Sequence, residues 1–295
     1  MNEPKLVAEC CCNHMGDFDL ALKMIDEISK SGADFAKFQK WDPEFALSHD
    51  QYNASHPNPH HSFGNPYGMH RKNLEFSKEQ HFSLKQYCED KDVIYSCSVF
   101  DHISAKQICD VNPDYIKIPS QKNLKTGIYD VVCKEFGGQI HLSTGMTSDE
   151  QLVRLIDVLD KYGALDRIVL YATTSSYPCS YDKLHLLRIA EYKNRFDEKL
   201  AAIGFSGHHN GIAADIAAVT LGAEYVERHF TLDRTMKGTD HAASLEPQGL
   251  TKLKRDMINV HSALTSRPEG ILDNELEAYN KVKADDANHF TETNS

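Results

Sequence analysis

Eight short apolar runs alternate with helical patterns along almost the whole chain, and this alternation limits the possible folds more than any other feature. Alternating strands and helices form parallel sheets, because each helix returns the chain to the same end of the sheet. A doubly wound open sheet is the alternative, but eight units without a break in composition favour closure. We therefore predict an α/β fold, a (β/α)8 TIM barrel, with strands near residues 6–11, 35–39, 93–98, 115–118, 141–143, 168–171, 202–205 and 225–229.

Two helices of the predicted barrel begin with a capping signal. Ser77 is followed three residues later by Gln80, and Thr147 is followed by Glu150. A Ser or Thr at the first position and a Glu or Gln three residues on can satisfy two free backbone N–H groups reciprocally. We therefore predict that one helix starts after Ser77, before the third strand, and another after Thr147, behind the fifth strand.

The connection over residues 40–76 is abnormally long for a barrel and is rich in Pro, Asn, His and Gly. It follows a strand at the end of the barrel where active sites lie, and loops this long in compact domains are usually functional. We predict a loop that contributes to the site. Its His60-His61 pair is expected to be solvated rather than to bind a metal.

Length and charge exclude several classes of protein. We predict a single catalytic domain over residues 1–283 and a disordered polar tail over 284–295. The formal net charge of −11 and the lack of a block rich in Lys and Arg disfavour nucleic-acid binding. No apolar run approaches the roughly 20 residues of a membrane span, and the first residues do not form a signal peptide. We therefore expect a cytoplasmic protein, without a membrane partner, whose eight cysteines are reduced.

Two histidines stand at the ends of consecutive predicted strands. His208 follows the strand near 202–205 and His229 ends the strand near 225–229, with a helical stretch between them. Consecutive parallel strands lie side by side, so both imidazoles should converge where α/β enzymes place their chemistry. Imidazole suits a borderline divalent metal, and two ligands leave positions open for substrate and water. We predict a metal site at His208 and His229, with two unrelated strand-end histidines as the alternative.

Lysines inside apolar strands indicate an anionic ligand. Lys37 and Lys117 each have apolar neighbours on both sides, and a buried lysine needs an anionic partner or loses its charge. A helix that begins just after residues 143–146 would direct free N–H groups into the same space. Together with hydroxyl groups at successive strand ends, these features predict a site for a phosphate and a carboxylate. The hydroxyls belong to Ser98, Ser120, Ser143 and Ser206.

Two acidic residues complement the cations. Glu9 lies in the first strand, where an unpaired buried carboxylate would be costly, and Asp240 lies in the loop after His229. Either carboxylate can bind sugar hydroxyls, support a metal ligand or transfer a proton. A turn-forming role after Gly238 is the alternative for Asp240.

Seven segments of the chain, in order, closely resemble the sialic acid synthase family. They are AECCCNHMG (8–16), GADFAKFQ (32–39), LSTGM (142–146), SYP (176–178), IGFS (203–206), ERHFTLD (227–233) and GTDHAASLEP (238–247). The resemblance spans about residues 5–280 and implies a (β/α)8 catalytic barrel. It also implies condensation of phosphoenolpyruvate with an open-chain N-acylated hexosamine, with Mn²⁺ or another divalent metal such as Mg²⁺ or Co²⁺, to give a nine-carbon ulosonic acid and phosphate.

The resemblance also assigns roles to individual residues. It implies that His208 and His229 bind the metal. It implies that one group of side chains binds the phosphate and carboxylate of phosphoenolpyruvate, namely Lys37, Lys117, Ser98, Ser120, Ser143 and Ser206. A second group would lie near the sugar, namely Glu9, Gln39, Tyr177 and Asp240, and Ser175 stands where an Asn often contacts substrate.

The chain departs from the family pattern near the acceptor and before the first metal histidine. Lys122 stands where most relatives have an acidic residue, which predicts a different or additionally anionic sugar, such as a phosphorylated or non-acetylated aldose. Gly207 replaces the usual Asp. The C-terminal antifreeze-like domain that caps the sugar in relatives is expected to be absent, so a separate capping protein is a predicted partner, and a homodimer is possible. A catalytically silent barrel that binds a ligand or partner is the remaining hypothesis.

Overall fold

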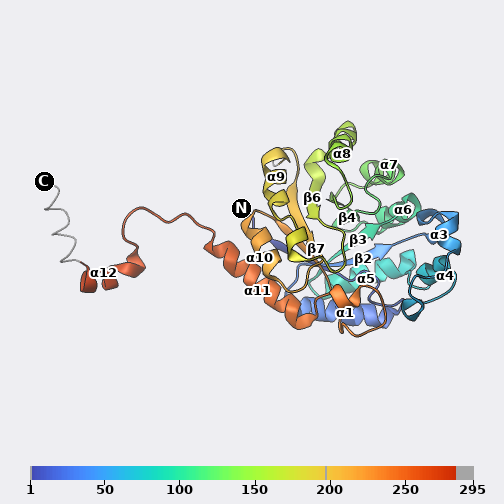
Figure 1. Cartoon of the computed structure of the whole chain (residues 1–295), viewed down its shortest axis with the longest axis horizontal. Helices are drawn as coiled ribbons and strands as arrows, with labels where there is room; N and C mark the ends of the chain where they lie inside the picture. Colours follow the sequence, from blue (N-terminus) through green and yellow to red (C-terminus); the bar gives the residue numbers. More distant parts are fainter. Residues whose placement is uncertain (1, 197, 284–295) are drawn as a thin grey trace. The chain divides into compact units, whose positions relative to one another are not determined.

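The chain forms a closed barrel of eight parallel strands that follow one another in sequence order, as seen in a computed structural model (Figure 1). The structure describes residues 2–196 and 198–283. The strands are β1 (Lys5–Glu9), β2 (Phe35–Lys40), β3 (Ile94–Val99), β4 (Tyr115–Ile118), β5 (Gln139–Ser143), β6 (Ile168–Thr173), β7 (Ala202–Gly207) and β8 (Tyr225–His229). β8 pairs with β1 in parallel and closes the barrel, which confirms the predicted (β/α)8 fold.

Helices connect the strands and pack on the outside of the barrel (Figure 1). The main ones are α1 (Phe18–Ser31), α5 (Lys78–Asp90), α6 (His102–Val111), α7 (Thr126–Glu135), α8 (Asp149–Lys161), α9 (Leu187–Phe196), α10 (Ala213–Thr220) and α11 (Pro247–Ala263). Short helical turns lie within the later connections, namely η2 (Leu165–Arg167), η3 (Tyr181–Lys183) and η4 (His241–Ala243).

The predicted element boundaries hold to within a few residues. β4 and β8 have the predicted bounds, whereas β1 ends at Glu9 and not at residue 11, because Cys11 leaves the extended conformation with a φ of 40°. The capping box at Ser77 and Gln80 is confirmed. The predicted box at Thr147 and Glu150 is wrong by one residue, because Ser148 and Gln151 form it instead. Both residue pairs, Thr147 with Glu150 and Ser148 with Gln151, satisfy the sequence pattern of a capping box.

The long connection between β2 and α5 is folded rather than an irregular loop. It contains α2 (Pro43–Ala46), α3 (His49–Asn53), η1 (Pro59–His61) and α4 (Tyr67–Lys72). The expectation of a solvated histidine pair holds for His60, which is exposed. His61 is half-buried, and its Nδ1 accepts a hydrogen bond of 3.1 Å from the backbone N–H of Gly238. This contact links the connection to the loop that carries Asp240.

Alternating side chains divide each strand between an outer and an inner face. Outward residues such as Leu6, Ala8 and Phe38 join the large apolar core between the strands and the helices. Inside the barrel, Val7, Phe35 and Tyr115 form a small apolar cluster at the amino ends of the strands. This plug closes one end of the barrel and leaves the carboxyl ends of the strands for polar residues.

The chain divides into two compact units, Met1–His261 and Ser262–Ser295. The first contains the whole barrel. In the second, η5 (Asp273–Glu275) precedes α12 (Leu276–Val282), and Arg267 forms an ion pair of 2.7 Å with Glu275. The predicted disordered tail, 284–295, lies outside the described residues. Over the part of the chain that the structure describes, no helix is both long and apolar enough to cross a membrane.

Candidate active site

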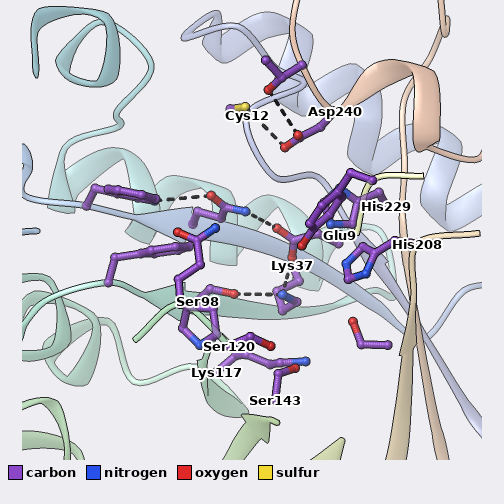
Figure 2. A pocket seen from close by; sticks show the side chains of 18 of the residues that line it. Glu9, Cys12, Lys37, Ser98, Lys117, Ser120, Ser143, His208, His229 and Asp240 are labelled. Atoms are coloured by element: carbon purple, nitrogen blue, oxygen red, sulfur yellow. Dashed lines mark hydrogen bonds and ion pairs between the residues drawn. The ribbon is translucent and has the colours of Figure 1, made fainter. Parts of the chain in front are cut away.

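A cavity of about 450 Å³ lies at the carboxyl ends of the strands (Figure 2). All but two of the predicted site residues line it, and together they come from every strand of the barrel or from the segment that follows it. The lining residues among them are Glu9, Lys37, Gln39, Ser98, Lys117, Ser120, Ser143, Tyr177, Ser206, His208, His229 and Asp240. The two exceptions are Lys122 and Ser175.

Lys37, on β2, lies between two carboxylates in the interior of the barrel. Its ammonium forms an ion pair with Glu9 and lies 3.4 Å from an oxygen of Glu227. It also donates a hydrogen bond of 2.8 Å to Ser98 Oγ (Figure 2). Gln39 Nε2 donates to the other oxygen of Glu9 at 2.7 Å, so the Glu9 carboxylate is fixed between β1 and β2.

Glu227, on β8, is the second buried carboxylate and was not predicted as a site residue. Lys117 Nζ donates to Glu227 Oε2 at 2.7 Å, and Ser206 Oγ donates to Oε1 at 3.0 Å. The Lys117 ammonium also lies 3.5 Å from the centre of the Tyr171 ring, a cation–π contact. Both strand lysines therefore have the anionic partner that their burial requires, and they share Glu227.

The pKa values of this cluster follow from burial and from the paired charges. Burial alone would lower the pKa of Lys37, but Glu227 and Glu9 outweigh it and raise that pKa. Burial lowers the pKa of Lys117 to about 8, against the opposing effect of Glu227. Burial alone would raise the pKa of Glu227, yet Lys117 and Lys37 hold it well below its usual range. Below pH 8 the site therefore contains two ammonium groups beside an ionised Glu227.

His208 and His229 converge as predicted, with ring centres 5.2 Å apart. His208 Nδ1 lies 3.0 Å from the carbonyl oxygen of Thr174, which can only accept, so Nδ1 carries the proton and Nε2 keeps its lone pair. Burial, reinforced by His229, lowers the pKa of His208 to about 3. His229 Nδ1 is buried without a hydrogen-bond partner among the described residues. A neutral imidazole with a free Nε2 beside an unpaired ring nitrogen fits a divalent metal.

The remaining side chains complete the mouth of the cavity. The centre of the Tyr177 ring lies 4.1 Å from the ring centre of His208 and 5.9 Å from that of His229. Asp240 is close to Cys12, whose Sγ lies 3.7 Å from Asp240 Oδ2 (Figure 2). On the opposite wall, Ser120 Oγ accepts a hydrogen bond of 3.0 Å from the backbone N–H of Gly145. The cavity thus has a charged interior, an imidazole pair and hydroxyl groups on one surface.

Comparison with known proteins decides the family. Residues 24–269 match the model of the NeuB family. The chain belongs to the NeuB family. It is 34% identical over 277 residues to N-acetylneuraminate-9-phosphate synthase of Homo sapiens, which covers 94% of this chain and 76% of that relative. It is 32% identical over 265 residues to N,N'-diacetyllegionaminic acid synthase of Campylobacter jejuni, which covers 90% of this chain and 78% of that relative.

Solved structures agree with this assignment. An N-acetylneuraminic acid (sialic acid) synthetase from Leptospira borgpetersenii serovar Hardjo-bovis, crystallised with citrate, superposes with a TM-score of 0.79 at 26% identity. The match covers 96% of this chain and 93% of that one. Membership of the NeuB family confirms the predicted enzyme class, a phosphoenolpyruvate-dependent transferase like the sialic acid synthases.

Lys122 lies outside the cavity of this NeuB barrel. Its Nζ donates a hydrogen bond of 2.7 Å to the carbonyl oxygen of Ala46, the last residue of α2. It lies 5.7 Å from the ring centre of Trp41, which does line the cavity. Lys122 therefore lies just behind the cavity wall, with its ammonium directed at the long connection.

Gly207, another departure from the expected pattern, has a packing explanation, and the structure does not explain Ser175. A Cβ at Gly207 would lie 2.7 Å from the Phe205 ring and 2.8 Å from His209 Nδ1, so an Asp there would require both rings to move. A Cβ at Gly145 would lie 2.2 Å from Ser175 Oγ and 2.7 Å from Ser120 Oγ. Gly145 thus lets the Ser120 and Ser175 hydroxyls approach its backbone closely, and only Ser120 lines the cavity.

Several cavity residues were not predicted. The long connection contributes Trp41, His56, Tyr67, His70 and Arg71, in keeping with the prediction that this segment is functional. Nothing in the sequence marks these five individually, because their positions depend on how α2 to α4 fold back over the barrel. Glu227 had a usable signal, since it lies two residues before His229 on one strand and must share its face.

Proposed function

We propose that this chain condenses phosphoenolpyruvate with an open-chain, N-acylhexosamine-like aldose to give a sialic-acid-like 3-deoxy-ulosonic acid and phosphate. The observation that supports this most is the buried cluster of Lys37, Lys117, Glu9 and Glu227 beside His208, all facing one cavity. Two ammonium groups and several hydroxyls offer charge-assisted hydrogen bonds to a phosphate and a carboxylate. The carboxylates and Gln39 offer acceptors and donors to sugar hydroxyls.

In the proposed reaction, C3 of phosphoenolpyruvate attacks the aldehyde carbon of the sugar, and the aldehyde oxygen takes up a proton. The resulting cation at C2 takes a water molecule, which loses a proton, and phosphate leaves as the C–O bond breaks. Lys37 and Lys117 hold the anionic groups of phosphoenolpyruvate in fixed positions, which stabilises the changing charges better than water does. Glu9 and Asp240 are the groups that bind sugar hydroxyls or exchange a proton.

We further propose that His208, through Nε2, and His229 hold a divalent metal, with Mn²⁺, Mg²⁺ and Co²⁺ as the ions that the family resemblance implies. When bound, the metal supplies a Lewis acid that polarises the aldehyde oxygen of the sugar. The hydrogen bond from His208 Nδ1 to Thr174 fixes the ring and presents Nε2 to the cavity.

The experiment that tests the proposal is phosphate release from phosphoenolpyruvate in the presence of Mn²⁺. N-acetylmannosamine, its 6-phosphate and a panel of other aldoses should be compared, and we expect release that depends on one of them. No release with any sugar, although calorimetry detects phosphoenolpyruvate binding, would support a required capping protein. Absence of both release and binding would overturn the proposal in favour of a silent barrel, for which the packing at Gly207 gives no support.

A phosphorylated aldose is the second candidate acceptor, and the position of Arg71 in the cavity wall favours it. Its guanidinium is buried in the cavity wall, 4.1 Å from the ring centre of Trp41, and its Nε has no hydrogen-bond partner among the described residues. Glu75 pairs with Nη2 at 3.0 Å, so the buried, unpaired Nε is left as an N–H group that a phosphate would satisfy once the cavity wall adjusts to it.

Replacing Arg71 by Lys therefore distinguishes the two acceptors. If the sugar is phosphorylated, R71K should raise its KM at least about tenfold, because the planar two-point contact is lost, about 1.4 kcal/mol. The KM of an unphosphorylated sugar should not change. Lys122→Met is the matched control, since Lys122 lies outside the cavity and its loss should leave both KM values unaltered. If K122M raised the KM of the phosphorylated sugar and R71K did not, the anion site would lie at Lys122.

The affinity for phosphoenolpyruvate should fall as the pH rises through about 8. Lys117 is charged below its pKa of about 8 and neutral above it, so a ligand anion loses one ammonium partner on the alkaline side. Titration calorimetry between pH 7 and pH 9.5 measures this step, because a group changes charge over roughly two pH units around its pKa. Lys117→Met should bind more weakly at pH 7 and show no step. A wild-type affinity that is flat over this range would contradict the assignment.

A homodimer, a separate capping protein and a cytoplasmic location complete the proposal. The homodimer and the capping protein rest on the family resemblance alone, and the cytoplasmic location rests on the sequence pattern. Size-exclusion chromatography with light scattering tests the dimer directly, and the phosphate-release assay above tests the need for a cap.

A further inference from the structure

Cys11 brings a buried thiol close to His229 and Asp240. The donor atoms of Cys11, His229 and Asp240 all lie within 4.8 Å of one another. Across residues 2–196 and 198–283, no other three His, Cys, Asp or Glu side chains meet this closely. Because metal–ligand bonds of about 2.0–2.3 Å place two donors on one ion at most about 4.6 Å apart, small side-chain rotations would bring all three donors onto one metal.

The three consecutive cysteines have different surroundings, and only the Cys11 thiol lies in the cluster with His229 and Asp240. Cys10 faces outward into the apolar core between strands and helices. Cys12 lines the cavity, with Sγ 3.7 Å from Asp240 Oδ2, but it does not belong to the cluster with His229. Cys11 is only 1% exposed, so its thiol is protected from solvent while it faces the two other donors.

The backbone at Cys11 adds a second observation. Its φ of 40° lies in the left-handed region, where glycine is favoured and residues with a side chain are uncommon. A strained residue at the carboxyl end of a barrel strand is typical of functional positions. The turn after β1 directs the Cys11 side chain inward at a cost that glycine would avoid.

We propose that Cys11 is a further protein ligand of the metal held by His208 and His229, that Asp240 is a ligand of the same metal rather than a contact to the sugar, and that the site therefore selects a thiophilic ion. This rests on the metal binding proposed above, and it adds the ligand that determines metal preference. Thiolate and imidazole donors favour Zn²⁺, Fe²⁺ and Co²⁺, whereas Mg²⁺ and Mn²⁺ prefer oxygen ligands. Of the ions that the family resemblance implies, Co²⁺ fits this donor set. His208 supplies a further nitrogen, with its ring centre 5.2 Å from that of His229.

Absorption spectroscopy of the full chain, freed of metal and titrated with Co²⁺, tests the ligand without reference to catalysis. A bound thiolate gives a sulfur-to-cobalt charge-transfer band in the near ultraviolet, and we expect this band in the unaltered chain. Cys11→Ser and Cys11→Gly should both lose it and should bind Co²⁺ at least about tenfold more weakly. Cys11→Gly suits the left-handed backbone, so it removes the thiol without adding backbone strain, and circular dichroism checks that the variant is folded.

Cys12→Ser is the matched control, because it removes the neighbouring thiol, which lines the cavity but does not belong to the cluster with His229, and should keep the band. A band that persists in both Cys11 variants, or that disappears only in Cys12→Ser, would overturn the proposal. Its failure and that of the proposed function are distinguishable. A chain that shows the band but releases no phosphate with any sugar, in the presence of Co²⁺ or of Mn²⁺, keeps the thiol ligand and loses the reaction. A chain that releases phosphate and shows no band keeps the proposed reaction and loses the thiol ligand.

Discussion

Replacing Lys37 by Met is expected to destabilise the barrel and to abolish turnover together. The Lys37 ammonium pairs with Glu9 and lies 3.4 Å from Glu227, and all three side chains are buried. Glu227 would keep Lys117 at 2.7 Å, but Glu9 would keep only the amide of Gln39. A buried carboxylate without its cation costs about 3–5 kcal/mol. Urea unfolding at pH 7 should show this loss, and phosphate release should fall at least about 100-fold.

The double variant Lys37→Met/Glu9→Gln separates the two effects. Because it removes both charges of the pair, it should recover most of the lost stability, since Gln at position 9 needs no counter-ion. Turnover should not recover, because phosphoenolpyruvate still lacks one of its two ammonium partners and the sugar has also lost the Glu9 carboxylate. Equal stability of the single and double variants would contradict the ion pair. Recovery of turnover in the double variant would show that Lys37 has no role beyond neutralising Glu9.

This cluster also shows what the sequence could and could not predict. The requirement for an anionic partner followed from Lys37 and Lys117 alone, because a lysine between apolar strand residues must be paired. The identity of that partner did not follow. Lys117 pairs with Glu227, which lies 110 residues further along the chain, and only closure of the barrel brings the two together. Local patterns determine which face a side chain occupies, whereas partners across the barrel depend on register.

The same distinction applies to the rest of the site. Predicted residues at strand ends reached the cavity because the carboxyl ends of parallel strands meet at one rim. Lys122 did not, because it lies beyond its strand in a segment whose direction no periodicity determines, and Ala46 holds it there. Arg71 and Trp41 were missed for a related reason. They lie in the folded connection between β2 and α5, and their place over the barrel depends on the packing of short helices.

Alanine substitution of the adjacent residues His208 and His209 should give opposite results. The two rings lie in different surroundings just beyond β7. His208 lines the cavity, and its free Nε2 is the proposed metal ligand. His209 is fully buried away from the cavity, with Nε2 3.2 Å from Arg228 Nη1 and 3.3 Å from Asp215. His208→Ala should therefore lower kcat/KM at least about 100-fold and leave the free energy of unfolding nearly unchanged.

His209→Ala should instead cost about 1–3 kcal/mol of stability, because Arg228 and Asp215 lose a buried polar contact, while each folded molecule keeps its turnover. Urea unfolding and phosphate release with an acceptor that supports turnover measure both quantities on the same samples. His229→Ala should behave like His208→Ala, since both rings face the cavity. If His208→Ala kept full turnover after treatment with a chelator, neither its imidazole nor a metal bound to it would be needed. The condensation would then depend on the lysine and glutamate cluster alone.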